Sequence, residues 1–383
     1  MNPVDEHAVT CVGCGNCENV CPVSAVKLHE DEEGFLYPVI QNDICIQCGK
    51  CRKACPMYQE QELTHVALHS YAAISKDKEI LKHSASGGMF ATLAKGFLRN
   101  KPYSVVVGAT YENGRCFHKM ITDESQIFEL QNSKYVQSQL GNIFVEIEKK
   151  LKNSIPVLFS GTPCQVNALR LFLKRDYESL FTIDIICHGV PSNKFLKRNL
   201  ELYTKQPENI KNLKFRLKNQ IRPTHSGFIL SFESDLKKQY VASNRDPYFS
   251  LFMSGDSYRE SCYKCKFASV NRVGDITLGD CDSHRYYPDF YPKHSVSSVV
   301  VNTDKGFELF SSCVENVDFC DLNLEKEADV NTQLLKPVSR KSLRNSIYKE
   351  LNNSKDYSSF AKKYSRKKRD WKEQLLLLKC KYL

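Results

Sequence analysis

Seventeen cysteines are unevenly spread along the 383 residues, and eight of them form two copies of one motif. Residues 11–22 read CVGCGNCENVCP, and residues 45–56 read CIQCGKCRKACP. Each copy is C-x2-C-x2-C-x3-C-P, a spacing that binds 4Fe-4S clusters, with the fourth cysteine of each run ligating the other cluster. Three thiolates two residues apart reach one cluster only from a tight loop, which Gly13, Gly15 and Gly49 allow. The repeat therefore predicts two 4Fe-4S clusters.

The crossed pairing defines the ligands of both clusters. One cluster takes Cys11, Cys14, Cys17 and Cys55, and the other takes Cys45, Cys48, Cys51 and Cys21. The alternative is a pair of zinc sites, since C-x2-C pairs also bind zinc, but zinc leaves the third cysteine of each run unexplained. Residues 3–60 resemble the two-cluster bacterial ferredoxin fold, with residues 34–40 (GFLYPVI) as the strand that links its halves.

A second group of cysteines follows the strands of a predicted α/β unit. Residues 156–161, 163–175 and 180–187 have the pattern of strand, helix and strand, which predicts a βαβ unit with parallel strands. The segments that follow the two strands then lie at the same edge of the sheet, where α/β proteins bind ligands. These segments place Cys164 and Cys187 at that edge.

The start of the predicted helix favours a reactive thiol. Thr162 suits the N-cap and Pro163 suits the first helical position, so Cys164 falls in the first turn, where the helix lowers a thiol pKa. Further along, Cys262 and Cys265 form a C-x2-C pair. With Cys164 and Cys187 they form a candidate third site, for which a 4Fe-4S cluster fits better than zinc.

A plainer interpretation of these four cysteines stays open. Cys164 and Cys187 are also the kind of small residue that is buried at strand ends, in which case only the later pair binds a metal. Five other cysteines are interpreted as ordinary thiols: Cys116, Cys281, Cys313, Cys320 and Cys380. Of these, Cys281 is close enough to a glycine-containing turn to serve as a spare ligand.

Two further segments suggest a cofactor that resembles a nucleotide. Residues 84–93 (SASGGMFATL) form a small-residue turn that leads into a helix, where free N–H groups can bind phosphate. Residues 272–280 (RVGDITLGD) place a short strand between two Gly-Asp turns, whose carboxylates can accept hydrogen bonds from ribose hydroxyls. Close packing explains a Gly-Gly pair equally well, and a plain turn explains a Gly-Asp pair.

These motifs resemble a known family. The chain is similar, over residues 70–320, to the coenzyme F420 hydrogenase/dehydrogenase beta subunit family. The motifs that carry the resemblance are SASGGMFATLAKGFL, SKYVQS, GTPCQVNALR, CHGVPS and CYKCKFASVNRVGDITLGD, in that order. With the ferredoxin-like segment in front, the chain resembles members found in polysaccharide-biosynthesis gene clusters.

The resemblance implies an iron–sulfur flavoprotein that holds FAD in its body and exchanges hydride with a soluble partner. It also implies that the third cluster is held by Cys164, Cys187, Cys262 and Cys265. The implied FAD neighbours are Ser86, Gly87, Gly88, Ser133, Lys134, Tyr135, Gly161, Thr162, Asp275 and Asp280. The chain departs from the family at residues 279–284 (GDCDSH), where an aromatic residue and a glycine are expected, so use of a deazaflavin partner stays open.

The expected fold is α/β (α+β), with a ferredoxin-like domain, a mixed α/β flavin-binding body and a basic helical tail. Residues 71–74 and 103–110 are predicted strands of the body, and residues 87–98 are a predicted helix. The predicted parts are a 4Fe-4S dicluster domain (1–62), an N-terminal-like part of the beta subunit (70–152), its C-terminal-like part (153–335) and the tail (336–383). We expect the ferredoxin-like domain and the body to have separate cores.

Composition narrows the class of protein. Hydrophobic residues make up 42% and charged residues 26%, as in ordinary globular proteins. No apolar run approaches the roughly 18 residues of a membrane-spanning helix, and the first residues lack a signal-peptide pattern, so a cytoplasmic location is expected. Residues 340–383 hold 14 Lys or Arg against 4 Asp or Glu, which accounts for the whole net charge of +10. The neutral body predicts no nucleic-acid partner.

Three functions are compatible with these patterns. The leading one is a reductase in which the clusters exchange electrons with FAD, and in which hydride passes to or from a coenzyme F420-like compound, NAD(P)H or a sugar-linked substrate. The alternative is an electron-transfer subunit without flavin that docks on a separate catalytic partner. The third is a zinc scaffold whose basic tail binds nucleic acid. The expected partners are a redox protein or a soluble hydride carrier, and a homo-oligomer is also compatible.

The tail has two interpretations of its own. The plain one is a solvated helix whose leucines at 375–378 pack on the body or on a second subunit. The other is a helix that contacts a membrane surface weakly, because a basic block precedes Trp371 and these leucines.

Overall fold

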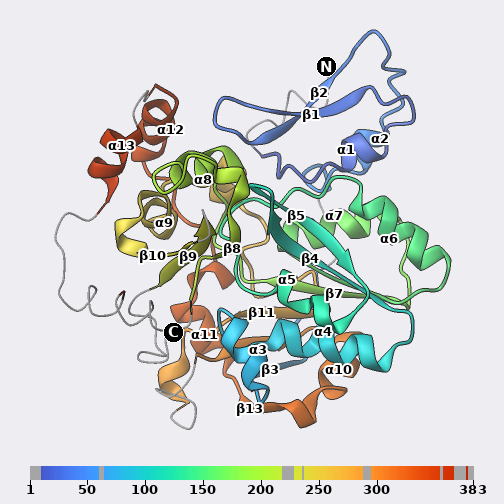
Figure 1. Ribbon diagram of the computed structural model, residues 1–383. Helices are drawn as coiled ribbons and strands as arrows, with labels where there is room; N and C mark the ends of the chain where they lie inside the picture. The colour runs from blue at the N-terminus through green and yellow to red at the C-terminus, as the bar shows by residue number, and fades with distance from the viewer. Residues whose placement is uncertain are drawn as a thin grey trace.

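A computed structural model describes residues 10–59, 64–217, 228–234, 237–287, 295–353, 357–365 and 377 (Figure 1). The N-terminal segment contains helices α1 (Asn16–Asn19) and α2 (Lys50–Lys53) and strands β1 (Val26–Glu30) and β2 (Leu36–Ile40). The strands pair antiparallel, with Val26 opposite Ile40. Each helix follows a glycine at positive φ, Gly15 at 75° and Gly49 at 68°, as the predicted cysteine loops require.

The body is built on one mixed sheet of eight strands in the order β13-β3-β12-β11-β7-β6-β4-β5. The strands are β3 (His69–Ser75), β4 (Val105–Glu112), β5 (Arg115–Ile121), β6 (Val157–Gly161), β7 (Leu180–Ile185), β11 (Ile276–Asp280), β12 (Ser297–Val301) and β13 (Val317–Asp321). Strands β4, β6, β7 and β11 run parallel, and the other strands of this sheet pair antiparallel. The predicted βαβ unit is confirmed as β6, α7 and β7, and the predicted α/β class is confirmed with it.

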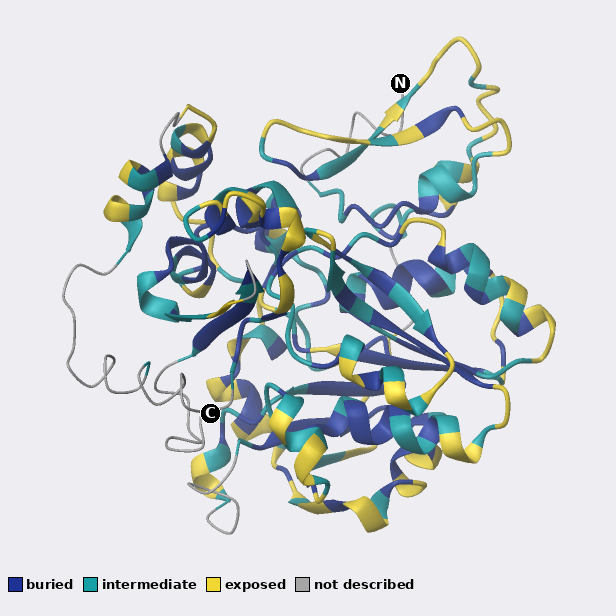
Figure 2. Ribbon diagram, in the orientation of Figure 1, coloured by how far each residue is buried: buried dark blue, intermediate teal, exposed yellow. Residues whose placement is uncertain are grey.

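Helices cover both faces of this sheet (Figure 1). Helices α4 (Met89–Asn100) and α10 (Asp304–Ser311) share one hydrophobic cluster with the sheet, and α6 (Ile143–Lys152) and α7 (Pro163–Leu173) share another. Short helices α3 (Lys78–His83), α5 (Ile127–Leu130) and α11 (Leu324–Val330) lie beside it. The strands are buried in their middle, whereas the N-terminal hairpin is mostly half-buried or exposed (Figure 2).

A smaller antiparallel sheet in the order β10-β9-β8 lies beside the large one. It contains β8 (Lys211–Lys214), β9 (Ile229–Ser234) and β10 (Lys237–Ala242), and it packs with α8 (Asn193–Leu200), α9 (Pro247–Met253), α12 (Leu343–Asn353) and α13 (Tyr357–Tyr364). The 3-10 helices are η1 (Glu124–Gln126), η2 (Pro207–Asn209), η3 (Ser243–Arg245), η4 (Glu260–Lys264), η5 (His284–Tyr286), η6 (Val314–Asn316) and η7 (Thr332–Leu334).

The two predicted parts of the body share one sheet. Strand β3 belongs to the part predicted at 70–152, yet it pairs with β12 and β13 of the part predicted at 153–335. Sheet hydrogen bonds thus join the two parts, because an inner strand needs partners on both edges. The expectation that the ferredoxin-like domain and the body have separate cores is wrong. Phe35 and Cys14 of the N-terminal segment lie in hydrophobic clusters of the body.

The tail is helical where the structure describes it. In α12, Ile347, Tyr348 and Leu351 are buried in the cluster of the small sheet, as are Tyr357 and Phe360 of α13. The basic block, Trp371 and the leucines other than Leu377 lie outside the described residues, and so does the membrane-surface prediction that rests on them. Within the described residues, no helix has the length and apolar character to cross a membrane.

Candidate functional site

The first predicted set of cysteines is brought together around a small cavity at the base of the N-terminal segment. Cys11, Cys14, Cys17 and Cys55 line it, together with Cys51. Burial raises the pKa of Cys17 to about 12, and the nearby thiolates of Cys11 and Cys55 contribute to that rise. Burial also raises the pKa of Cys14 and Cys55, so the site is suited to a positively charged iron core that would stabilise thiolates there.

The loop of this set is tied to both the second run and the body. Asn16 is fully buried, and its Nδ2 donates to Ala54 O at 3.0 Å and to Ala168 O at 2.7 Å. Ala54 precedes Cys55, and Ala168 lies on α7. A buried amide with these two long-range partners fixes the loop against the first turns of α7.

The second predicted set lies nearer the surface. Burial raises the pKa of Cys51, and the nearby thiolates of Cys48 and Cys45 raise it further. These two cysteines therefore lie close to Cys51, and Cys48 is exposed. Cys21 lies on the turn after α1, and Ala25 N donates to its Sγ at 3.2 Å. Burial opposes ionisation of Cys21, but the backbone N–H groups around it outweigh that effect and lower its pKa. A lowered pKa favours the thiolate that binds metal.

The third group gathers from three separate loops. Cys164 lies in the first turn of α7, Cys187 follows β7, and Cys262 and Cys265 lie in and just after η4. Burial raises the pKa of Cys187, and the thiolates of the other three cysteines raise it further. The structure thus brings all four together, which the strand-end interpretation of Cys164 and Cys187 did not require.

One expectation about this group is wrong. The helix start forms as predicted, with Thr162 and Gln165 in a capping box and Pro163 in the first turn. The pKa of Cys164 is nevertheless raised to about 11, because burial and the neighbouring Cys265 outweigh the favourable helix end. The case for Cys164 as a ligand therefore rests on its position beside the other three cysteines and not on a low thiol pKa.

The described residues contain no group of three or more His, Cys, Asp or Glu side chains close enough to hold one metal ion. In a 4Fe-4S cluster each cysteine binds a different iron, so the sulfur atoms surround a wider object than a single ion. The gathered but spaced thiols of the first and third groups fit the wider object.

A cavity of about 560 Å³ extends from the third group of cysteines across the edge of the large sheet. Cys164, Cys187, Cys262 and Cys265 line one part of it. Eight of the ten predicted FAD neighbours also line it: Ser86, Gly88, Ser133, Lys134, Tyr135, Gly161, Thr162 and Asp280. Motifs that are far apart in sequence therefore meet at one cavity.

Gly87 and Asp275 do not line the cavity. A Cβ on Gly87 would lie 2.4 Å from Ala73 O, so this glycine allows close packing of α4 on β3. Asp275 is buried and accepts hydrogen bonds from Thr182 N at 2.7 Å and Thr182 Oγ1 at 2.6 Å. The alternative interpretations of these two motifs, packing and a plain turn, account for both residues.

Several polar groups at the cavity carry no signal in the sequence. His118 stacks on Phe159, its Nε2 lies 3.0 Å from Ser160 O, and burial lowers its pKa to about 4. Its Nδ1 is buried and has no partner among the described residues. Arg216 donates to Asp280 at 2.5 Å. These residues come from β5 and from the segment after β8, so only the fold places them together.

Lys134 is a cation at this cavity without a carboxylate partner among the described residues. Its Nζ donates to Gln131 O at 2.6 Å and to Glu129 O at 3.4 Å. Burial lowers its pKa to about 8. A buried ammonium held only by carbonyl groups fits an anionic ligand in the space beside it.

The departure from the family pattern at residues 279–284 has a structural role. Ser283 N and Oγ donate to Glu327, and Asp282 N donates to the same buried carboxylate. Burial raises the pKa of Asp282 to about 7, with further contributions from Asp280 and Glu327. Asp282 also lines the cavity, so this acidic group belongs to the site.

Models of known protein families match three segments of the chain. The family model for the C terminus of the coenzyme F420 hydrogenase/dehydrogenase beta subunit matches residues 156–326. Two models of a 4Fe-4S dicluster domain match residues 10–58 and 37–85. No curated protein matches the chain significantly.

Among solved structures, the chain is similar to one chain of the xenon-derivatised F420-reducing NiFe hydrogenase complex from Methanosarcina barkeri. The two chains share 17% sequence identity at a TM-score of 0.49, over 72% of this chain and 93% of the other. The family matches are the stronger finding. This chain thus carries a segment that matches a 4Fe-4S dicluster domain, in front of a segment that matches the C terminus of the coenzyme F420 hydrogenase/dehydrogenase beta subunit, and these matches indicate an iron–sulfur electron-transfer protein.

Proposed function

We propose that this protein is an iron–sulfur flavoprotein oxidoreductase that links single-electron transfer in its clusters to hydride exchange with a soluble compound. The observation that carries the proposal is the shared cavity. Cysteines from three loops and the residues suited to a flavin nucleotide line the same space of about 560 Å³. That volume lies within the roughly 300–1,000 Å³ of typical cofactor sites.

The third group of cysteines is the proposed site of a further 4Fe-4S cluster. Its four thiols come from rigid positions: a capped helix start, a strand end and a 3-10 helix. Burial of Cys164, Cys187 and Cys262 disfavours free thiolates there, so the site is suited to a group that supplies positive charge.

FAD is the proposed occupant of the rest of the cavity, and it would supply the conversion between single-electron and two-electron chemistry. Gly88, at φ 80°, is the N-cap of the 12-residue helix α4, and Gly88, Met89 and Phe90 line the cavity, so the positive end of this helix is suited to a phosphate there. Lys134 adds a positive charge suited to phosphate. Nδ1 of His118, which has no partner among the described residues, can hydrogen-bond a bound ligand.

The test of FAD binding is the flavin released by acid from protein purified without oxygen. We expect about one FAD per chain. The Lys134→Met variant should retain less flavin, whereas Lys152→Met, at an exposed lysine of α6, should retain the same amount as the intact protein. Absence of FAD in the intact protein would contradict the flavin assignment.

A second candidate is an electron-transfer subunit without flavin that docks on a catalytic partner. The matching family is described as a beta subunit, which favours work within a larger complex. Stopped-flow mixing with reduced F420, NADPH or reduced ferredoxin separates the two functions. Flavin bleaching by one donor supports the oxidoreductase, and cluster reduction without any flavin signal supports the subunit.

A further inference from the structure

Arg259 is a buried cation whose partners are all neutral. Its side chain donates to Cys11 O at 2.6 Å, Leu36 O at 2.8 Å and Gln137 Oε1 at 3.2 Å. It is 1% exposed, and no carboxylate pairs with it in the part of the chain that the structure describes. A buried guanidinium is costly unless a negative charge lies near it, so its surroundings should contain one when the protein is complete.

The guanidinium lies against the loop of the first cysteine set. A Cβ on Gly13 would lie 3.1 Å from Arg259 Nη1 and 3.3 Å from its Cζ. Gly13 stands between Cys11 and Cys14, two proposed ligands of one cluster. A side chain at this position would crowd both the guanidinium and Gln137 Nε2, and the φ of 66° at Gly13 also favours glycine.

The backbone of Arg259 belongs to the third cysteine group. Its N–H donates to Val190 O at 2.9 Å, three residues after Cys187, and its carbonyl accepts from Cys262 N at 2.9 Å. Burial raises the pKa of Cys262, and the charge of Arg259 opposes that rise. One residue therefore contacts the loops of two proposed cluster sites.

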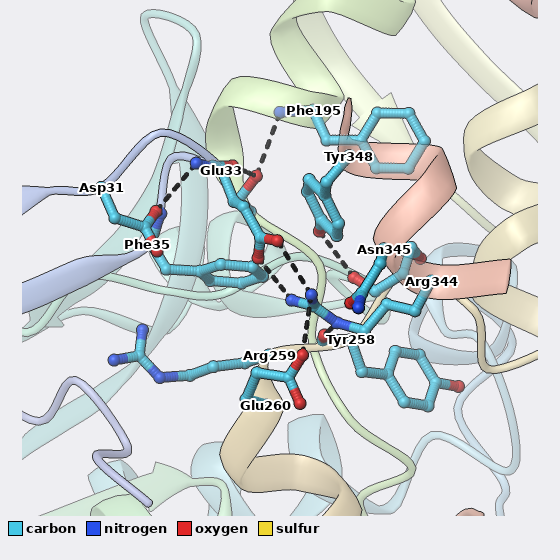
Figure 3. A network of polar contacts seen from close by, with 12 residues as sticks. Asp31, Glu33, Phe35, Phe195, Tyr258, Arg259, Glu260, Arg344, Asn345 and Tyr348 are labelled. Carbon is cyan, nitrogen blue, oxygen red and sulfur yellow. Dashed lines mark hydrogen bonds and ion pairs between the residues drawn. The ribbon is translucent and has the colours of Figure 1, made fainter. Parts of the chain in front are cut away.

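Aromatic rings enclose the guanidinium and hold it in place. Its Cζ lies 4.1 Å from the ring centre of Tyr37 and 5.4 Å from that of Phe35. Figure 3 shows Arg259 running past Phe35 from the same loop that carries Glu260. Both rings come from the N-terminal hairpin, so docking of that hairpin excludes water from the charge and strengthens its field.

We propose that Arg259 is a positioning residue that sets the reduction potentials of the clusters at its two ends. Its guanidinium lies at the proposed cluster of Cys11, Cys14, Cys17 and Cys55. Its backbone lies at the proposed third cluster, that of Cys164, Cys187, Cys262 and Cys265. For the third cluster, but not for the first, this inference rests on the proposed function.

The reason is electrostatic. Reduction adds one electron, and thus one negative charge, to a cluster, and a fixed cation beside it stabilises the reduced form. Because Arg259 contacts the loops of both sites, it would stabilise the added charge on a cluster bound at either one, and so would raise both reduction potentials.

Potentiometric titration of the clusters, followed by electron paramagnetic resonance, tests this role. In Arg259→Gln, the reduced-to-oxidised ratio of both adjacent clusters at a fixed potential should fall at least tenfold, which is about 59 mV for a one-electron couple. Arg259→Lys keeps the charge and should restore most of the shift. The cluster of Cys21, Cys45, Cys48 and Cys51 serves as an internal control and should not change.

A second variant covers the case in which Arg259→Gln does not fold. Gln137→Glu is nearly isosteric and places a negative charge beside Nη1, so it should lower the same potentials. Unchanged potentials in a variant with full iron content would overturn the inference. Eight irons in the intact protein would instead remove the third cluster from the proposed function, and the shift at the first cluster would still be measured.

Discussion

Arg344 of α12 forms an ion pair with Glu33, 311 positions away, in the turn between β1 and β2. Arg344 Nη1 donates to Glu33 Oε1 at 2.9 Å, and the same nitrogen lies 2.9 Å from Glu260 Oε1. Arg344 is 1% exposed, and its Nε donates to Tyr258 O at 2.7 Å (Figure 3). The C-terminal helix thus fastens the N-terminal hairpin to the loop that leads to Cys262.

Removing this link should loosen the N-terminal segment. Arg344→Met leaves Glu33 without its cation, whereas Glu260 keeps Arg340, and breaking such a partly buried pair from one side costs about 1–3 kcal/mol. We expect a lower urea midpoint and faster proteolysis between the segment and the body.

Glu33→Gln should lower the stability less than Arg344→Met does, because Arg344 keeps its ion pair with Glu260. Glu32→Gln is the matched control, since Glu32 is exposed and its backbone carbonyl, which the substitution keeps, accepts from Lys194 Nζ. Equal stability of Arg344→Met and Glu32→Gln would contradict the link.

Substitution of two cluster cysteines should have unequal effects. Cys14 is buried in the hydrophobic cluster that α6 and α7 share with the sheet, whereas Cys48 is exposed. Both Cys14→Ser and Cys48→Ser should lose one cluster. Cys14→Ser should also destabilise the body by about 1–3 kcal/mol, because it buries a hydroxyl among apolar groups. Anaerobic thermal unfolding and FAD content measure the difference, and identical melting and flavin content would show that the two regions have separate cores after all.

Asp282 should make stability depend on pH. Burial raises its folded-state pKa to about 7 from the ordinary value of 3.8, so the folded protein binds a proton more tightly than the unfolded chain. The contribution of the neutral acid to stability is full below about pH 4 and is lost as pH rises through about 7. Asp282→Asn keeps the neutral form at every pH.

The difference in melting temperature between Asp282→Asn and the intact protein should therefore grow between about pH 4 and pH 7 and level off at higher pH. Asp304→Asn, at the first residue of α10, is a control on another element. A difference that stays constant over this range would mean that Asp282 titrates normally.

The features of the site that depend on residues close together in the sequence could be predicted. Cysteine spacing, the Gly-rich loops and the Thr162–Pro163 helix start are each specified within a few residues, and each forms as expected. The pairing of β3 between β12 and β13 could not be predicted, because strand neighbours depend on contacts between residues far apart in the chain. For the same reason Arg259, which follows no motif, gave no signal.

The pKa of Cys164 shows a further limit. Its helix position favours a low value, yet burial decides the outcome, and the sequence does not show how deeply a residue is buried.

Iron content of the chain purified without oxygen tests the central claim most directly. Three four-iron clusters predict about twelve irons per chain. The Cys262→Ala and Cys265→Ala double variant should fall to about eight while keeping the resonance signals of the two N-terminal clusters. Eight irons in the intact protein, unchanged by this double variant, would contradict a third cluster at the shared cavity.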